Sequence, residues 1–217
     1  MSLKNTGIQM KDKALLFING DAPESFPDLE IYNMIACTDG AFHYLKKLNF
    51  PLNTLDFISG DFDSHSGSDE NVYHEKFIHT PDQNRTDFHK ALEIILEKGI
   101  KNVDVFGGSG GEQDHFLGNL TVAFGFKDQL NIQFFDEFSE YYFIPKSFSI
   151  GGVKHKIVSL YPFPLAERIT TKGLKWNLEN LNANMTTDML TRNLAVEDKV
   201  SIEYLNGNLL FFVGKKR

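Results

Sequence analysis

Short apolar runs alternate with helical patterns over the first 135 residues of the chain. Runs of apolar residues that end in a polar turn predict buried strands at residues 14–18, 34–37, 55–59, 76–79, 102–106 and 130–135. The clearest helix is predicted at residues 86–98, where Phe88, Leu92 and Ile95 follow helical spacing. Further helices are predicted from about residue 41 and at residues 114–124. This alternation favours a mainly parallel sheet covered on both faces, in an α/β domain over residues 1–138.

The pattern changes after about residue 138, where helical periodicity stops. Strands are predicted at residues 141–144, 154–161, 168–172, 200–205 and 209–213. The pair Asn206-Gly207 stands between two of these runs and indicates a β-hairpin. We therefore expect a second, small antiparallel β domain over residues 139–217.

Composition and charge narrow the class of protein. Hydrophobic residues make up 41% of the 217 residues, which is enough for a packed core and excludes a wholly disordered chain. Residues 1–135 contain 20 acidic and 11 basic side chains, whereas residues 136–217 contain 9 and 11. An acidic chain without a basic stripe is a poor candidate for binding nucleic acid. Its acidic half would suit a divalent cation.

The chain also carries signals about its compartment. Cys37 is the single cysteine, which excludes an intramolecular disulfide and a cysteine-based zinc site and fits a reducing cytosol. No apolar run reaches the roughly 18 residues of a membrane span, and the N-terminus has no signal-peptide core. We expect a cytoplasmic protein without a membrane partner.

Acidic residues and glycines follow four of the predicted strands. These segments are Asp39-Gly40, Gly60–Ser64, Thr80–Asp87 and Gly107–Asp114. Ligands of an open parallel sheet gather at the carboxyl ends of its strands, so the four segments are expected to meet at one edge.

Asp61 and Asp63 stand two residues apart, which in an extended chain places both carboxylates on one side, about 6.6 Å apart. Such a pair can bracket one Mg²⁺, although an acidic turn that caps a helix is an alternative. Asp87 begins the predicted helix at 86–98, either as a third carboxylate of the same site or as a partner of the helix dipole. Gln83 and Arg85 lie on the approach to it and could contact a ligand.

Three weaker signals remain. The run Gly107–Gly111 between a strand and a helix could cradle phosphate through its backbone N–H groups, and no P-loop motif is present. Asp114 and His115 begin the next helix, as a cap or as ligand contacts. Trp176 is either a packed aromatic residue or a stacking platform for a cationic ring.

Together these segments resemble one enzyme family. The resemblance to thiamin pyrophosphokinases is carried by Ala36–Gly40, Ile58–Ser64, Thr80–Asp87, Gly107–Asn119 and Gly173–Trp176, which occur in the family's order. It implies a mainly parallel three-layer α/β nucleotide-binding domain followed by a small antiparallel β-sandwich domain. It also implies the reaction of ATP with thiamin to give thiamin diphosphate and AMP, with Mg²⁺, in a homodimer whose thiamin site lies between subunits.

The resemblance also implies roles for individual residues. The metal-binding residues would be Asp39, Asp61 and Asp63, and the catalytic residues Asp61, Asp63 and Asp87. The ATP-binding residues would be Ser64, Arg85, Gly107, Gly108, Gly110, Gly111, Asp114 and His115. The thiamin-binding residues would be Gln83, Asp87, Asn193 and Trp176, the last from the partner subunit.

Two other functions compete with this interpretation. A metal-dependent nucleotidyl- or glycosyltransferase could use Asp61-x-Asp63 to bind a nucleotide-sugar diphosphate, but it would leave Trp176 unexplained. A non-catalytic thiamin or nucleotide sensor is the other alternative. Its mark would be Glu112, which stands where many members of the resembled family have arginine.

Overall fold

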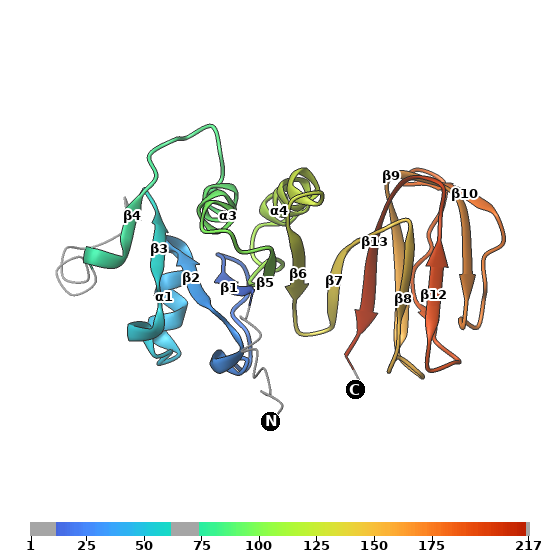
Figure 1. Ribbon diagram of the computed structural model, residues 1–217, viewed down its shortest axis with the longest axis horizontal. Helices are drawn as coiled ribbons and strands as arrows, with labels where there is room; N and C mark the ends of the chain where they lie inside the picture. Colours follow the sequence, from blue (N-terminus) through green and yellow to red (C-terminus); the bar gives the residue numbers. More distant parts are fainter. Residues whose placement is uncertain (1–11, 62–73, 216–217) are drawn as a thin grey trace, which may run out of the picture. The chain divides into compact units, whose positions relative to one another are not determined.

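The computed structural model describes residues 12–61 and 74–215, which form two compact units (Figure 1). The first unit contains the described residues up to 122 together with 128–131, and the second contains 123–127 and the residues from 132 onward. No helix in the described part of the chain is long and apolar enough to cross a membrane.

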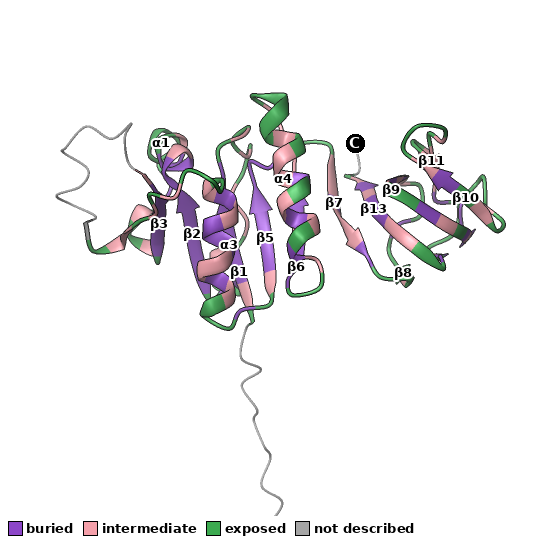
Figure 2. Ribbon diagram, turned by 90° about the horizontal axis from the view of Figure 1, so that it is seen from above, coloured by how far each residue is buried: buried purple, intermediate pink, exposed green. Residues whose placement is uncertain are grey.

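The sheet of the first unit is parallel, as the sequence predicts. Its strands are β1 (Lys13–Phe17), β2 (Met34–Thr38), β3 (Phe57–Gly60), β4 (Phe77–His79) and β5 (Asn102–Phe106), in the order β4-β3-β2-β1-β5. The central strands are buried along most of their length (Figure 2). Burial on both faces explains why these strands are continuous apolar runs rather than alternating ones.

Helices cover both faces of this sheet. Helices α1 (Asp39–Lys47) and α3 (Asp87–Glu97) contact the same two strands, β2 and β3, from opposite sides (Figure 1). Helix α4 (Gln113–Phe126) begins on the same side as α3. Short 3-10 helices occur at Leu29–Ile31, Leu52–Thr54 and His74–Lys76. The predicted three-layer α/β arrangement is confirmed.

Local sequence sets the limits of α3. The Thr86 side chain accepts a hydrogen bond from the His89 N–H at 3.2 Å, which caps the first turn. The helix stops before Gly99, whose φ of +81° suits a glycine that ends a helix.

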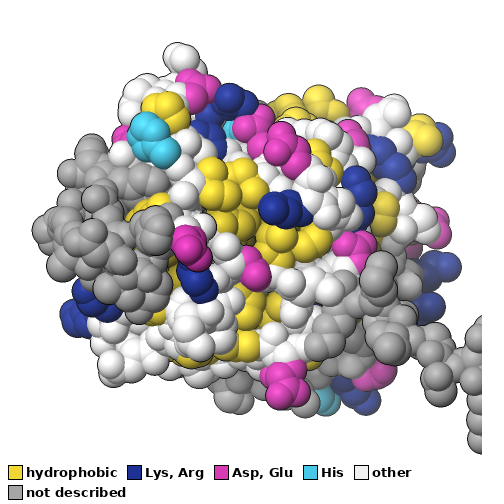
Figure 3. All heavy atoms as spheres, turned by 60° about the vertical axis from the view of Figure 1, so that its left-hand side comes forward, with side chains coloured by type: hydrophobic (Ala, Val, Ile, Leu, Met, Phe, Trp, Pro, Cys, Tyr) yellow, Lys and Arg dark blue, Asp and Glu magenta, His cyan; other side chains and the backbone are white. Residues whose placement is uncertain are grey.

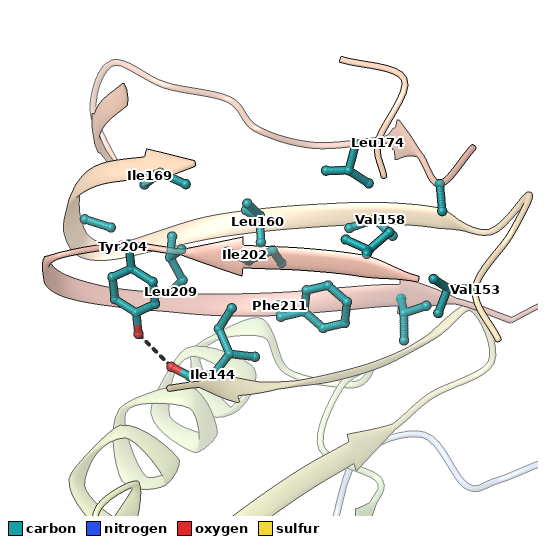
Figure 4. Packing of buried hydrophobic residues seen from close by; sticks show 14 of the residues in the cluster. Ile144, Val153, Val158, Leu160, Ile169, Leu174, Ile202, Tyr204, Leu209 and Phe211 are labelled. Atoms are coloured by element: carbon teal, nitrogen blue, oxygen red, sulfur yellow. Dashed lines mark hydrogen bonds between the residues drawn. The ribbon is translucent and has the colours of Figure 1, made fainter. Parts of the chain in front are cut away.

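The second unit is an antiparallel β-sandwich. Its strands are β6 (Asn131–Phe135), β7 (Ser139–Ile144), β8 (Ser147–Ile150), β9 (Ile157–Lys172), β10 (Leu181–Asn184), β11 (Asn193–Leu194), β12 (Val200–Glu203) and β13 (Asn206–Gly214). Side chains of β7, β9, β12 and β13 fill one shared core (Figure 4). The buried hydroxyl of Tyr204 donates a hydrogen bond to the carbonyl of Ile144 at 2.6 Å.

The prediction of separate strands at 154–161 and 168–172 is wrong, because β9 is one strand from Ile157 to Lys172. Pro162 and Pro164 interrupt the sequence pattern without ending the strand. Residues 158–167 of β9 pair with β13, and residues 170–172 pair with β12. A strand that changes partner along its length turns a corner between sheets. Strands β8, β10 and β11 were not predicted.

The predicted hairpin at Asn206-Gly207 is also wrong. β12 pairs with β8 and β9, whereas β13 pairs with β7 and β9. Gly207 lies within β13 opposite Ala166, where the register shifts. A Cβ atom at this position would lie 2.0 Å from the carbonyl oxygen of Leu165. The glycine therefore permits a close approach of two strands rather than a turn.

Candidate functional site

A cavity of about 440 Å³ lies at the carboxyl ends of the parallel strands. It is lined by residues 18–20, 38–39, 61, 83–88, 90, 110, 114–115 and 118–119. The chain runs outward from β1 to β4 and then returns to β5 on the other side of β1. The cavity therefore lies at the point where the strand order reverses, which is where open parallel sheets bind ligands.

Asp39 and Asp61 form the acidic wall of this cavity. Asp39 is the first residue of α1, is only 6% exposed, and accepts a hydrogen bond from the Gly40 N–H at 2.6 Å. A Cβ atom at Gly60 would lie 2.2 Å from the Asp39 carboxylate. Glycine at this position therefore lets the carboxylate rest against the backbone directly before Asp61.

This wall offers oxygen ligands to a hard cation. Thr38 Oγ1 and Ser59 Oγ precede the two aspartates in the chain, are buried, and have no hydrogen-bond partner among the described residues. An oxygen-only set of this kind suits Mg²⁺. No three acidic, histidine or cysteine side chains of residues 12–61 and 74–215 gather closely enough to hold a metal by themselves. Asp63 and Ser64, the other predicted residues of this segment, lie outside the described residues.

The segment 80–87 lies next to Asp61, and its residues 83–87 line the cavity. Gln83 Nε2 donates a hydrogen bond to Asp61 Oδ2 at 3.0 Å, so a predicted thiamin contact and a predicted metal ligand touch each other. Asp87 begins α3 with a half-buried carboxylate, and its Oδ1 lies 2.7 Å from the ammonium of Lys90. The Thr80 N–H donates to the Gly60 carbonyl at 2.9 Å, which joins this segment to the end of β3.

Arg85 lines the cavity, but its guanidinium is engaged by protein carboxylates. Nε lies 2.8 Å from Asp82 Oδ2, and Nη1 lies 2.5 Å from Glu93 Oε1. The Asn84 N–H and the Arg85 side chain together lower the pKa of Asp82. Figure 3 shows that acidic and basic side chains are interspersed over one face of the molecule.

The glycine-rich segment 107–111 is held against the loop after β1. The Ile18 N–H donates to the Phe106 carbonyl and the Asp21 N–H to the Ser109 carbonyl, both at 2.9 Å. Asn119 Nδ2 donates to the Gly108 carbonyl at 3.0 Å. Gly110 lines the cavity, whereas the predicted residues Gly107, Gly108 and Gly111 are not among its lining residues.

Asp114 and His115 line the cavity from the start of α4. Asp114 Oδ1 accepts a hydrogen bond from the His115 N–H at 3.0 Å. His115 Nε2 lies 3.6 Å from Glu112 Oε2, and both side chains are exposed. Glu112 therefore faces a histidine at the edge of the cavity rather than its interior.

A second cavity, of about 180 Å³, lies in the second unit. Its lining is mainly apolar and consists of Val158, Leu160, Leu174, Trp176, Leu178, Met189, Leu190, Thr191 and Asn193. Asn193 Nδ2 donates to the Trp176 carbonyl at 2.7 Å, and Asn193 Oδ1 accepts from the Trp176 N–H at 3.2 Å. Trp176 is 57% exposed, and the ammonium of Lys175 lies 4.6 Å from the centroid of its ring. The asparagine thus positions the backbone of the tryptophan.

The sequence analysis assigned no role to six polar residues that line the larger cavity: Asn19, Thr38, Asn84, Thr86, Lys90 and Asn119. Asn19 could have been predicted as a site residue, since Asn19-Gly20 follows the first predicted strand just as Asp39-Gly40 follows the second. Lys90 was available less directly, as a cation three residues after Asp87 on the same helix. The other four lie within segments that carry the family resemblance, but nothing in the sequence singles out their side chains.

Two family models match the chain. Residues 29–134 match the catalytic domain of thiamin pyrophosphokinase, and residues 143–209 match its vitamin B1 binding domain. The chain belongs to the thiamin pyrophosphokinase family. The nucleotidyl- or glycosyltransferase interpretation is not favoured.

Named thiamin pyrophosphokinases are similar over most of the chain. The thiamine pyrophosphokinase of Bacillus subtilis is 26% identical over 211 residues, which is 91% of this chain and 97% of that protein. Thiamin pyrophosphokinase 1 of Caenorhabditis elegans is 27% identical over 188 residues, 81% of this chain and 76% of that protein.

Solved thiamin pyrophosphokinase structures share the fold. A family protein from Enterococcus faecalis superposes with a TM-score of 0.82 at 22% identity, over 94% of this chain and all of that chain. The Bacillus subtilis enzyme superposes with a TM-score of 0.79 at 21% identity, with the same coverage.

Proposed function

We propose that this chain transfers the pyrophosphoryl group of ATP to the hydroxyl of thiamin, giving thiamin diphosphate and AMP. The observation that carries the proposal is the convergence of Asp39, Asp61 and Asp87 on one cavity where the strand order reverses. Membership of the thiamin pyrophosphokinase family supports the same reaction. A cavity of about 440 Å³ is in the range that binds small molecules.

ATP would enter the cavity as an anion beside carboxylates, so a cation is needed between them. Asp39 and Asp61, with Asp63, would hold Mg²⁺, which neutralises charge on the phosphates when it is bound. The buried hydroxyls of Thr38 and Ser59 could donate hydrogen bonds behind this pair. This assignment gives a reason for an acidic wall in a site that binds an anion.

The remaining ATP contacts would come from Ser64 and from the loops on the far side. The backbone at Gly107, Gly108, Gly110 and Gly111, with Asp114 and His115 at the start of α4, would border the nucleotide. Free backbone N–H groups at the start of a helix attract phosphate. Arg85 would reach ATP only by leaving Asp82 or Glu93, which hold it at 2.8 and 2.5 Å.

The chemical step needs an oriented hydroxyl. The thiamin oxygen attacks the β-phosphorus, a new oxygen–phosphorus bond forms, and the bond to the oxygen bridging the α- and β-phosphorus breaks, so that AMP leaves with the electron pair. Asp87 would accept the hydrogen bond of the hydroxyl, direct its lone pair and take up its proton as the new bond forms. Gln83 would contact thiamin. Alignment of this kind supplies much of the rate in a phosphoryl transfer.

The thiamin-binding site would be completed by the second unit of the partner subunit, within a homodimer. Trp176 of the partner subunit would stack on the cationic ring of thiamin, with Asn193 holding its backbone in place. The exposure of Trp176 supports this role. Residues 1–138 would then be the ATP and Mg²⁺ domain and residues 139–217 the thiamin domain of a cytoplasmic enzyme.

The test is the release of AMP from ATP and Mg²⁺, with and without thiamin, with the product identified by mass. We expect AMP only when thiamin is present, together with thiamin diphosphate, and loss of both when Mg²⁺ is chelated. Thiamin that raises the melting temperature without any turnover would identify a sensor instead. Turnover of a nucleotide sugar without thiamin would identify the competing transferase.

A further inference from the structure

Lys90 is a buried cation at the wall of the larger cavity. Its side chain is only 7% exposed. The ammonium donates to the Thr80 carbonyl at 2.7 Å and to the Asp82 carbonyl at 3.3 Å, and it lies 2.7 Å from Asp87 Oδ1. An ammonium group has three protons, and these three acceptors use all of them.

Because all three protons of its ammonium group are bonded within the protein, Lys90 has a structural role and is not available to bind an anionic ligand. Lysine is rarely buried unless it is paired, because an unpaired charge away from water is costly. The three acceptors belong to two different pieces of the chain: the segment before α3 and the first residue of α3 itself. Lys90 therefore links residues 80 and 82 to the carboxylate of Asp87. The residues between them in the chain, 83–86, include Gln83.

We infer that Lys90 is the positioning residue for Asp87 and for the segment 80–87 in the transfer to thiamin. The inference rests on the proposed function, in which Asp87 orients the hydroxyl. Lys90 holds one oxygen of the Asp87 carboxylate, so the other oxygen is presented in a fixed direction. It acts through Asp87 and the segment and not by contact with substrate.

This role predicts a specific kinetic signature for K90M, which keeps the length of the side chain and removes its donors. We expect kcat to fall about 10–100-fold, since small displacements of an aligned group have effects of this size. The KM for ATP should change less than about threefold. The matched control is K98M, which removes an exposed lysine just after the same helix and should behave as wild type. Rates are compared per folded protein, from the unfolding curve of each variant.

A double-variant cycle separates positioning from general damage. If Lys90 acts on the chemical step mainly through Asp87, adding K90M to D87N should lower kcat by much less than K90M lowers it in wild type. Effects that multiply would overturn the inference. A raised KM for ATP with unchanged kcat would also overturn it, because Lys90 would then bind the nucleotide directly.

Amide hydrogen exchange supplies a readout that does not need turnover. In K90M the amides of residues 82–86 should exchange at least about 10-fold faster than in wild type, while those of residues 91–96 change less than about threefold. Unchanged exchange at 82–86 would overturn the inference whether or not the enzyme is active. If wild type gives no thiamin-dependent AMP, the proposed function fails, and the exchange result alone decides whether Lys90 fixes the segment.

The variant K90R tests the same positioning role if K90M does not fold. Arginine retains the charge, but its planar group cannot place its donors on the same three acceptors. We expect K90R to fold, to lower kcat at least about fivefold, and to loosen residues 82–86. Wild-type kcat together with wild-type exchange in K90R would contradict a positioning role.

Discussion

The two cavities of this chain are built on opposite physical principles. The cavity of the first unit collects charged and polar side chains from several loops, because the carboxyl ends of parallel strands meet at one edge. The cavity of the second unit lies between β9 and the loops at residues 174–178 and 189–191 and is mainly apolar. The first arrangement suits charge and alignment, and the second suits shape and stacking.

The two sites also keep their functional groups in place differently. In the first unit functional side chains also contact one another, as Gln83 does with Asp61 and Lys90 with Asp87, in addition to their bonds to the backbone. In the second unit a side chain holds the backbone, since the Asn193 amide both donates to and accepts from Trp176. We therefore expect substitutions in the first cavity to affect the chemical step and those in the second to affect substrate affinity.

The largest effect is expected for D61N, which removes one charge from the acidic wall and keeps its shape. Because Asp61 would hold the cation that neutralises the phosphates, kcat should fall about 10²–10³-fold. The free energy of unfolding should change by less than about 0.5 kcal/mol, as is usual for a site that is not part of the core. The measurements are AMP release and urea unfolding.

E97Q is the control, since Glu97 is an exposed carboxylate at the end of α3 and outside the cavity lining. It should keep wild-type turnover. Turnover of D61N within threefold of wild type would remove Asp61 from the reaction.

A smaller effect is expected for W176A in the second unit. Loss of stacking on a cationic ring is worth about 0.5–2 kcal/mol, which corresponds to a rise of about 2–30-fold in the KM for thiamin. The KM for ATP should stay within about twofold, and W176F should lie between wild type and W176A. These values come from initial rates with each substrate varied in turn.

Leu205 provides the comparison, because it is an exposed apolar residue of the same unit that does not line this cavity. L205A should leave both KM values unchanged. An equal rise in both KM values for W176A would contradict a separate stacking role for Trp176.

The effect that is smallest near neutral pH concerns stability at high pH, through Tyr142 in the second unit. Burial, with a contribution from Glu140, raises the pKa of Tyr142 to about 12, against about 10 for an unfolded tyrosine. Between these values the unfolded chain loses the proton first. The contribution of this pKa difference to the free energy of unfolding is therefore complete below about pH 10 and is lost as the pH rises to about 12.

Y142F removes this titration and keeps the ring. The difference in unfolding free energy between wild type and Y142F should be constant below about pH 9 and should shift against wild type between about pH 10 and 12. Denaturant unfolding at a series of pH values measures it. Parallel curves for the two proteins would show that Tyr142 does not titrate in this way.

Much of the first unit could be predicted from the chain alone, because local signals agree there. The apolar spacing around Leu92, the cap at Thr86 and the stop at Gly99 each favour the same helix, and the structure confirms it. Asp39, Asp61 and Asp87 each follow a predicted strand or begin a predicted helix. The rule for the ends of parallel strands was therefore sufficient to bring them to one cavity.

The second unit shows where local signals fail. Pro162 predicts a strand end and Gly207 a turn, yet β9 continues and Gly207 lies within a strand. Both outcomes depend on pairing between residues about 40 apart in the chain, as between Ala166 and Gly207. Such pairing is decided by which strands bury their apolar faces together.

In the first unit the sequence by itself determined the order of elements, the parallel sheet and the aspartates at its edge, because these follow from periodicity over a few neighbouring residues. Only the tertiary structure decided that Lys90 faces inward to three acceptors and that Asn193 holds Trp176. A lysine in a helix is usually solvated. Its acceptors at residues 80, 82 and 87 are close to it in the chain, but they meet the ammonium only because the segment before α3 folds back against the end of β3, where the Thr80 N–H bonds to the Gly60 carbonyl.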